Sequence, residues 1–140
     1  MIEIRFGDSP HGIEIELSGL PKDLRNVQQS ILNLVRNKSQ QFYVIKAAIV
    51  DPFPYKVCLS SLHIYKNDSF VRVWVSENSL QIEGDSEKLE IFAAWFEFDD
   101  GNVEGYHHHF DYYGNEWWVN ANSNPLVISV RDPVQCPDTA

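Results

Sequence analysis

The chain opens with two short runs in which hydrophobic and polar residues alternate. Ile2, Ile4 and Phe6 mark the first run, and Ile13, Ile15 and Leu17 mark the second, with a turn-forming segment at residues 7–12 between them. Alternation with a period of two is typical of strands that bury one face. Two such runs joined by a short polar turn predict a hairpin.

The hydrophobic spacing then changes from two residues to three or four. Gly19 and Pro21 mark the change, and Pro is well placed in the first turn of a helix. Apolar residues follow at helical spacing, which predicts one amphipathic helix over about residues 21–36. They are Leu24, Val27, Ile31 and Leu34. Beyond it we expect a rather buried strand over residues 42–50, a break at residues 52–54 and a further strand over residues 59–65.

The second half shows the same order of patterns. Strands are expected around residues 70–75 and 80–82, followed by a helix that starts at Asp85 or Ser86, either of which can cap it, and ends near residues 99–102. Three more strands are expected, over residues 106–113, 117–119 and 126–130, with a turn at residues 114–115. We expect the chain to fray after Asp132.

Placing Gly84 on Gly19 aligns the hydrophobic positions of the two halves. Five hydrophobic positions of the first half then align with five of the second: Ile15 with Leu80, Leu17 with Ile82, Leu24 with Leu89, Val27 with Phe92 and Ile31 with Phe96. The expected fold is therefore α+β, an antiparallel-rich sheet with two helices on one face, built from two strand-strand-helix-strand-strand pseudo-repeats over about residues 1–66 and 67–132. Chance alignment of two hairpin-plus-helix segments is the alternative. Residues 1–132 are expected to form a single domain and residues 133–140 a flexible tail.

Composition and charge narrow the class of partner. The 140 residues are 44% hydrophobic and 13% aromatic, enough for a proper core, and the formal net charge is −9. Nucleic acid and anionic membranes are polyanions that attract cationic proteins, so both are disfavoured as partners. A basic partner fits better, and simple solubility is the alternative explanation of the charge.

Two further features bear on location. No apolar run approaches the length needed to span a bilayer, and the first five residues lack the basic start and apolar core of a signal peptide. We therefore expect a cytoplasmic protein. Cys58 and Cys136 form neither a disulfide framework nor a metal-binding spacing, so free thiols are expected.

The triple histidine at residues 107–109 invites a metal hypothesis. On a strand, His107, His109 and Asp111 point to one side, whereas His108 and Phe110 point to the other together with Tyr106 and Tyr112. Two histidines at i and i+2 with a carboxylate can supply three zinc ligands. No fourth ligand is evident, so a polar, partly exposed strand face is the preferred interpretation, and a pH-sensitive or partner-contacting surface is a further one. A metal-binding protein or metal-dependent enzyme is the alternative.

Other catalytic patterns are absent from the sequence. It contains no GxSxG motif, no phosphate-binding Gly-rich loop and no Cys-His signature, so we expect no catalysis and no cofactor. Acids and aromatics are instead interleaved between Trp95 and Trp118. Tyr and Trp often anchor interfaces, and a negative rim attracts a positive partner, although many of these aromatics must be buried in the core. Because Trp117 and Trp118 are adjacent, a strand would send them to opposite faces.

Three segments of the second half resemble immunity protein family 32 of bacterial polymorphic-toxin systems. They are residues 79–84 (SLQIEG), with Leu89 and Ala93 after them, residues 107–112 (HHHFDY) and residues 123–128 (SNPLVI). The resemblance covers roughly half of the chain. It implies a small α+β protein that neutralises a cognate toxin by binding it, and it makes His107, His109 and Asp111 candidates for toxin contact.

Together, the pattern and the resemblance give a set of candidate partner-binding residues. They are His107, His109, Asp111, Tyr113, Glu116 and Trp117. The expected partner is a cognate toxin domain with a basic surface. A structural protein that associates with itself through an exposed sheet edge is a further alternative.

Overall fold

The first hairpin and helix form where the patterns predict them. In the computed structural model, which describes residues 1–114 and 117–132, β1 (Glu3–Ser9) pairs antiparallel with β2 (Gly12–Gly19). α1 (Pro21–Arg36) follows directly and buries the predicted apolar stripe. The Asp23 carboxylate accepts a hydrogen bond of 3.2 Å from the Leu20 backbone N–H, which satisfies one of the free donors at the start of the helix.

The remaining elements alternate between strands and a second helix. Asp85 caps that helix, because its Oδ1 accepts a hydrogen bond of 2.8 Å from the backbone N–H of Lys88. In chain order the elements are β3 (Phe42–Lys46), β4 (Val57–Leu59), β5 (Ser61–Lys66), β6 (Arg72–Ser76), β7 (Ser79–Gly84), α2 (Ser86–Ala93), the 3-10 helix η1 (Ala94–Phe96), β8 (His107–Phe110) and β9 (Leu126–Val130).

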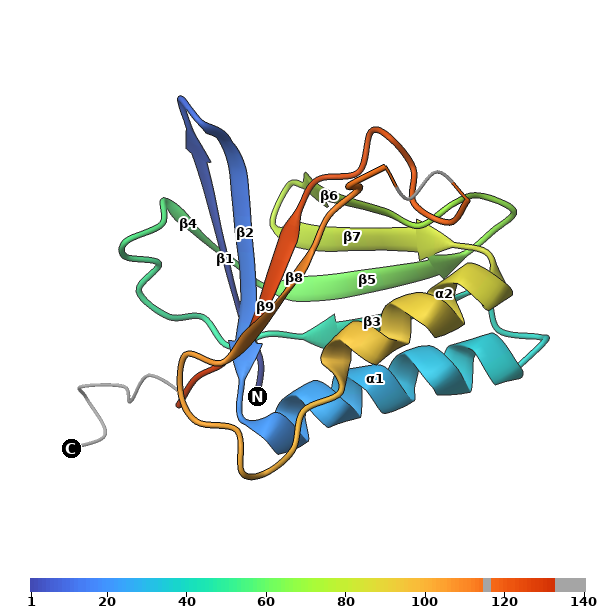
Figure 1. Ribbon diagram of the computed structural model, residues 1–140, viewed down its shortest axis with the longest axis horizontal. Coiled ribbons are helices and arrows are strands. Elements are labelled where there is room, and N and C mark those ends of the chain that lie inside the picture. Colours follow the sequence, from blue (N-terminus) through green and yellow to red (C-terminus); the bar gives the residue numbers. More distant parts are fainter. Residues whose placement is uncertain (115–116, 133–140) are drawn as a thin grey trace.

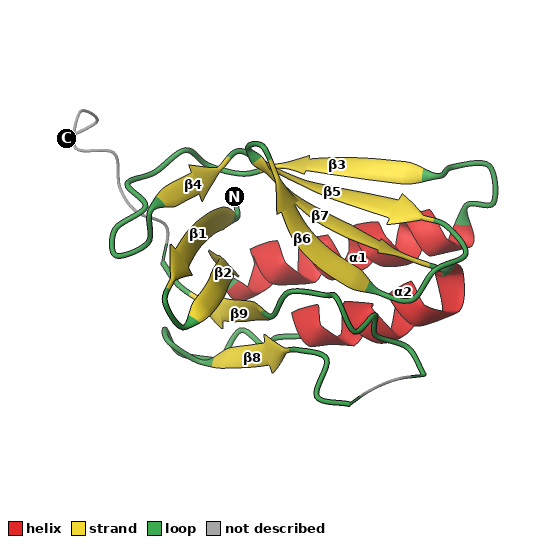
Figure 2. Ribbon diagram, turned by 90° about the horizontal axis from the view of Figure 1, so that it is seen from above, coloured by secondary structure: helices red, strands yellow, loops and turns green. Residues whose placement is uncertain are grey.

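The strands are divided between two mixed sheets, whereas the sequence predicted one. Sheet A has the order β4-β1-β2-β9-β8 and sheet B the order β3-β5-β7-β6, and their strands run crosswise in Figure 1. The α+β class is confirmed, and most neighbouring strands are antiparallel. Both helices cover one face of sheet B (Figure 2). Alternation shows which side chains face a core, but it does not show which strands become neighbours.

The two halves of the chain exchange strands. In sheet A, β2 of the first half lies parallel to β9 of the second, and in sheet B, β7 of the second half lies parallel to β5 of the first. Each sheet therefore joins the first hairpin of one half to the last antiparallel strand pair of the other. The element order repeats as the sequence predicts, apart from the short strand β4.

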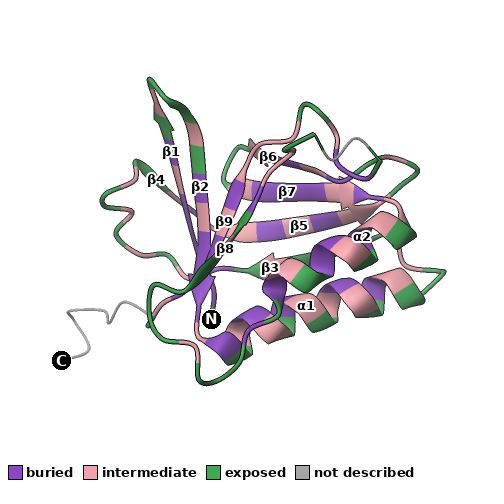
Figure 3. Cartoon of the chain, in the orientation of Figure 1, coloured by how far each residue is buried: buried purple, intermediate pink, exposed green. Residues whose placement is uncertain are grey.

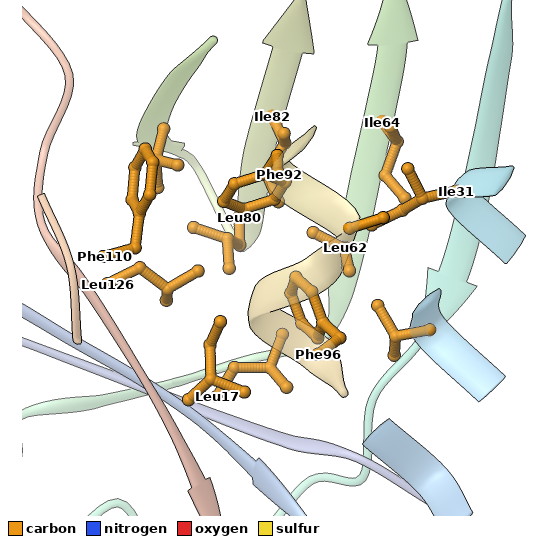
Figure 4. Close-up of a cluster of buried hydrophobic side chains, with 14 of the residues drawn as sticks. Leu17, Ile31, Leu62, Ile64, Leu80, Ile82, Phe92, Phe96, Phe110 and Leu126 are labelled. Carbon is orange, nitrogen blue, oxygen red and sulfur yellow. The ribbon is translucent and has the colours of Figure 1, made fainter. Parts of the chain in front are cut away.

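One cluster of buried side chains holds both sheets and both helices together (Figures 3 and 4). Figure 4 shows Leu17 and Leu126 of sheet A converging on Leu62 and Leu80 of sheet B, with Phe92 of α2 near them. Neither half could bury its hydrophobic face alone, because each sheet takes strands from both halves. The segment predicted to be a flexible tail, residues 133–140, lies outside the described residues.

Several strand predictions are corrected by the structure. The predicted buried strand at residues 42–50 ends at Lys46 and is mostly exposed, because β3 is the edge of sheet B. The predicted strand at residues 59–65 is two strands in different sheets, and the chain crosses between them at Ser60. Residues 117–119 form no strand. Val119 makes only an isolated bridge to Val71.

No helix among the described residues is both long enough and apolar enough to cross a membrane.

Candidate functional site

The three consecutive histidines point alternately to the two faces of sheet A. β8 pairs antiparallel with β9, so that His107 lies opposite Ser129 and His109 opposite Val127. Phe110 is fully buried on the core side, whereas His107 and His109 are exposed on the other side, which we call the outer face of sheet A. The predicted division of this strand into a core face and a polar face is confirmed.

His108 belongs to the structural side of the strand. Its Nδ1 lies 2.8 Å from the backbone oxygen of Trp95, and its ring stacks on Phe98 with the centroids 4.3 Å apart. These contacts tie β8 to the segment that follows α2. His108 therefore holds the strand in place, and only its two neighbours in sequence are available on the outer face.

His107 and His109 each have one contact through Nδ1. In His107, Nδ1 lies 3.1 Å from the Gly105 backbone oxygen, and in His109 it lies 3.0 Å from the hydroxyl of Tyr113. Asp111 Oδ1 accepts a hydrogen bond from the backbone N–H of Tyr112. Within residues 1–114 and 117–132, no three His, Cys, Asp or Glu side chains are grouped so that they could hold a metal ion. The geometry therefore gives no support to the metal alternative.

β2 and β9 extend the polar face across sheet A. The parallel register places Glu16 beside Val127, and Ser18 beside Ser129. The Glu16 carboxylate accepts a hydrogen bond of 3.0 Å from the Ser129 hydroxyl and pairs with Arg131 at 3.2 Å. Glu14 lies two residues before Glu16 on the same face and is exposed. The outer face of sheet A therefore carries carboxylates next to the histidine strand.

The segment between β3 and β4 folds over this face and brings Tyr55 onto it. The Lys56 backbone N–H donates a hydrogen bond of 3.1 Å to the backbone oxygen of Phe6, and the Lys56 ammonium donates one of 2.7 Å to the backbone oxygen of Asp8. Burial raises the pKa of the Tyr55 phenol above its ordinary value, and the charges of Glu16 and Glu14 raise it further, whereas Arg131 acts in the opposite direction. The phenol is therefore neutral at physiological pH and can donate a hydrogen bond.

Tyr55 and Val127 separate two hollows on the outer face. The larger, of about 460 Å³, is lined by His107 and by Glu16, Glu104, Ser129 and Arg131 among others. The smaller, of about 330 Å³, contains His109 and Asp111 together with Glu14, Ile13, Ile15 and Pro125. The predicted residues His107, His109 and Asp111 thus share one face, but they line two adjacent hollows.

The other predicted contact residues lie in different places. Tyr113 is exposed and joined to His109 through its hydroxyl. Trp117 is 63% exposed and lies beside the buried Trp118, in a segment whose backbone is bonded to Val71 next to sheet B. Glu116 lies outside the described residues.

Three residues of this surface were not predicted from the sequence. Glu14, Glu16 and Tyr55 lie far from β8 in the chain, and they reach it only through the pairing of β2 with β9 and the fold of the segment before β4. The polar positions of the first hairpin were a usable signal, since alternation placed Glu14 and Glu16 on its non-core side. Nothing in the sequence indicated which strand would lie beside them.

Comparison with known proteins adds no relative. A scan against protein-family models, a search of curated proteins and a search of solved structures each find no match to this chain.

Proposed function

We propose that this chain is an immunity-type protein of the bacterial cytoplasm that binds a cognate toxin domain and neutralises it by covering its active surface, without catalysis. The observation that carries the proposal is the outer face of sheet A. It presents the carboxylates of Glu14, Glu104 and Asp111 around two hollows, with Tyr55 between them. Within the segment that resembles the immunity family, residues 107–112, His107, His109 and Asp111 line these hollows.

Electrostatics supports a basic partner. The chain carries 20 acidic and 11 basic residues, and among the described residues the only strong cation that lines the two hollows is Arg131, which is already paired with Glu16. Acidic groups at a rim accelerate association with a positive surface and orient it. Toxins that act on nucleic acid have basic clefts, and a protein face of carboxylates can occupy such a cleft in place of the anionic substrate.

The aromatic groups supply the buried area that charges alone do not. Tyr55 separates the two hollows, and Tyr113 is exposed three residues after β8. Val127 and Pro125 line the smaller hollow with the acids. Interfaces commonly place aromatic anchors at the centre and charged groups at the rim. Tyr55 is held by its loop before binding, so little conformational entropy is lost when a partner covers it.

The test is coexpression with the toxin domain encoded beside this chain's gene. The wild-type chain should copurify with the toxin and restore growth of cells that express it. Absence of both a complex and growth rescue would overturn the proposal. The association rate, measured by surface plasmon resonance, should fall as salt is raised, because screening weakens the attraction between exposed charges.

Charge reversal locates the contact. The double variant Glu14→Lys/Asp111→Lys should weaken binding by at least about tenfold, the equivalent of 1.4 kcal/mol, since both carboxylates line the smaller hollow. Glu87→Lys/Glu90→Lys is the matched control, because it makes the same change in net charge at two exposed acids on α2, away from this face. Equal losses in the control and in the double variant would show that net charge, and not this surface, determines binding.

A further inference from the structure

An unblocked strand edge lies on the opposite side of the molecule from the histidine strand. β3 pairs with β5 on one side only, and within residues 1–114 and 117–132 no strand pairs with its other side (Figure 2). Three consecutive large residues of β3 are exposed: Phe42 at 56%, Tyr43 at 42% and Val44 at 41%. Natural edge strands are usually protected by charge, proline or a bulge. Among these devices β3 has only Lys46.

The backbone of β3 is ready to accept another strand. The Lys66 N–H bonds the Gln41 oxygen and the Ala47 N–H bonds the Ser60 oxygen, so alternate residues from Gln41 to Ala47 direct their backbone groups toward β5. The backbone N–H and C=O of Phe42, Val44 and Lys46 therefore point away from sheet B. The Gln40 side chain donates to the Phe42 oxygen, which leaves Val44 at the centre of the open edge.

We infer that this edge pairs with β3 of a second copy of the chain, antiparallel about a two-fold axis at Val44. Each Val44 then exchanges both backbone hydrogen bonds with its symmetry mate, and Phe42 lies opposite Lys46 of the other copy. The two four-stranded sheets become one continuous eight-stranded sheet. A two-fold interface needs a self-complementary surface, and this register provides one.

The side chains in this register are also complementary. Lys46 meets the Phe42 ring of the other copy, which permits a cation–π contact, and no two like charges are placed opposite each other. On the helix side of the strand, Tyr43 faces Ile45 of the other copy. Both faces of the new strand pair thus cover apolar surface that is exposed in the single chain.

The charge around the edge favours a second copy over the basic partner of sheet A. β3 contains no acid, and a groove of about 290 Å³ between β3 and α1 has Asp23 as its only carboxylate among the described residues, paired with the Met1 amino group at 3.2 Å. Two chains with a net charge of −9 repel each other least where their surfaces are nearly neutral. A cationic toxin surface gains nothing from an edge that carries Lys46.

Mass measurement and a backbone substitution test the inference. The purified chain alone, without any toxin, should sediment at about twice its mass of 16.2 kDa at micromolar concentration. Val44→Pro removes the outward N–H without removing a bond to β5. It should therefore sediment as a monomer, and circular dichroism should show that it is folded. Val44→Thr keeps both the N–H and the β-branched shape and should remain a dimer. A wild-type monomer, or a dimer that survives Val44→Pro, would overturn the inference.

Disulfide trapping tests the register even if the proline variant fails to fold. With Cys58 and Cys136 replaced by Ser, Val44→Cys should form an intermolecular disulfide on mild oxidation, because paired Cα atoms about 5.5 Å apart suit the bond. Phe42→Cys is the matched control, since its counterpart lies four residues away along the partner strand, about 13 Å distant. Equal crosslinking of both variants, or none of Val44→Cys, would rule out the proposed pairing. Neither result bears on toxin binding through sheet A.

Discussion

Arg5 and Glu3 form an ion pair that is buried on the polar side of sheet A. Their side chains project from the same face of β1, with 2.8 Å between Nη2 and Oε1, and they are 1% and 2% exposed. Arg5 Nη1 also lies 3.4 Å from the Ser18 hydroxyl. Arg5 also acts on Tyr55, because its charge lowers the pKa of the Tyr55 phenol and so opposes the effect of burial.

Breaking this pair from one side should be costly. Arg5→Met is expected to lower the free energy of unfolding by about 3–5 kcal/mol, because it takes a charged partner from a carboxylate that stays buried. Urea denaturation measures the loss. Asp100→Asn is the matched control, since Asp100 forms an exposed ion pair with Arg25; it should change stability by less than about 1 kcal/mol.

Replacing both partners together should cost much less. The Nε of Arg5 is buried with no hydrogen-bond partner among the described residues, so part of the cost of burying this guanidinium is not compensated. Glu3→Leu/Arg5→Met should therefore recover most of the stability lost in Arg5→Met, as apolar replacements of buried ion pairs often do. If the double variant lost as much stability as Arg5→Met alone and Glu3→Leu alone lose together, the pair would be needed for the fold of β1.

Local features of this fold could be predicted from the sequence, whereas its strand neighbours could not. The bounds of α1 and the two faces of β8 follow from side-chain spacing over a few residues. Glu16 and Ser129, in contrast, are 113 positions apart and meet only because β2 lies parallel to β9. Residue spacing carries no information about such a contact. The candidate site was therefore half predicted, through β8, and half missed, through β2 and Tyr55.

The two glycines on which the halves were aligned share a local constraint in the structure. Gly19 and Gly84 each end a strand before a helix, and a Cβ atom at either position would meet a residue of that helix at close range. For Gly19 the contact is Asp23 Cβ at 3.1 Å, and for Gly84 it is the Leu89 side chain at 3.2 Å. One physical cause therefore explains the glycine at both positions: the strand end approaches the start of the next helix closely.

Gly84→Ala should therefore destabilise the protein. The added methyl group would be forced against Val71 and Leu89, both fully buried, and overpacking of this kind costs about 1–3 kcal/mol. Thermal unfolding followed by circular dichroism measures the change. Gly101→Ala is the control, because nothing lies within 4 Å of its Cβ position. If the two variants had the same stability, the crowding explanation for Gly84 would be wrong.

The raised pKa of Tyr55 gives a stability change at alkaline pH. Burial, followed by the charges of Glu16 and Glu14, raises this pKa above 10.0, its ordinary value. The folded state then holds the phenol proton more tightly than the unfolded state does. The resulting stabilisation relative to the ionised form is fully present below pH 10.0 and is lost as the pH rises through the folded pKa.

Tyr55→Phe isolates this effect. The free energy of unfolding of the wild-type chain should fall more steeply above pH 10.0 than that of Tyr55→Phe, since the variant has no phenol to ionise at this position. Glu14→Gln should make this fall smaller without moving its onset, because it removes a charge that raises the folded pKa and so narrows the pH range between the unfolded and folded pKa values. Parallel stability curves for the wild-type chain and Tyr55→Phe would show that Tyr55 titrates normally.

The three adjacent histidines should separate stability from binding. His108→Ala removes a hydrogen bond to Trp95 and a ring stacked on Phe98, so it should lower the free energy of unfolding by about 1–3 kcal/mol. His107→Ala and His109→Ala alter exposed side chains and should stay within about 0.5 kcal/mol of the wild type. Toxin affinity, measured by calorimetry, should show the reverse order.

That reversal distinguishes a binding strand from a merely structural one. All three variants lose an imidazole from the same four-residue strand, so differences in charge and composition cancel, and only the face of the strand differs. If His107→Ala and His109→Ala bind the toxin as tightly as the wild type does, the contact must lie elsewhere on the acidic surface. In that case Tyr55, which separates the two hollows, becomes the next residue to replace, because it borders both.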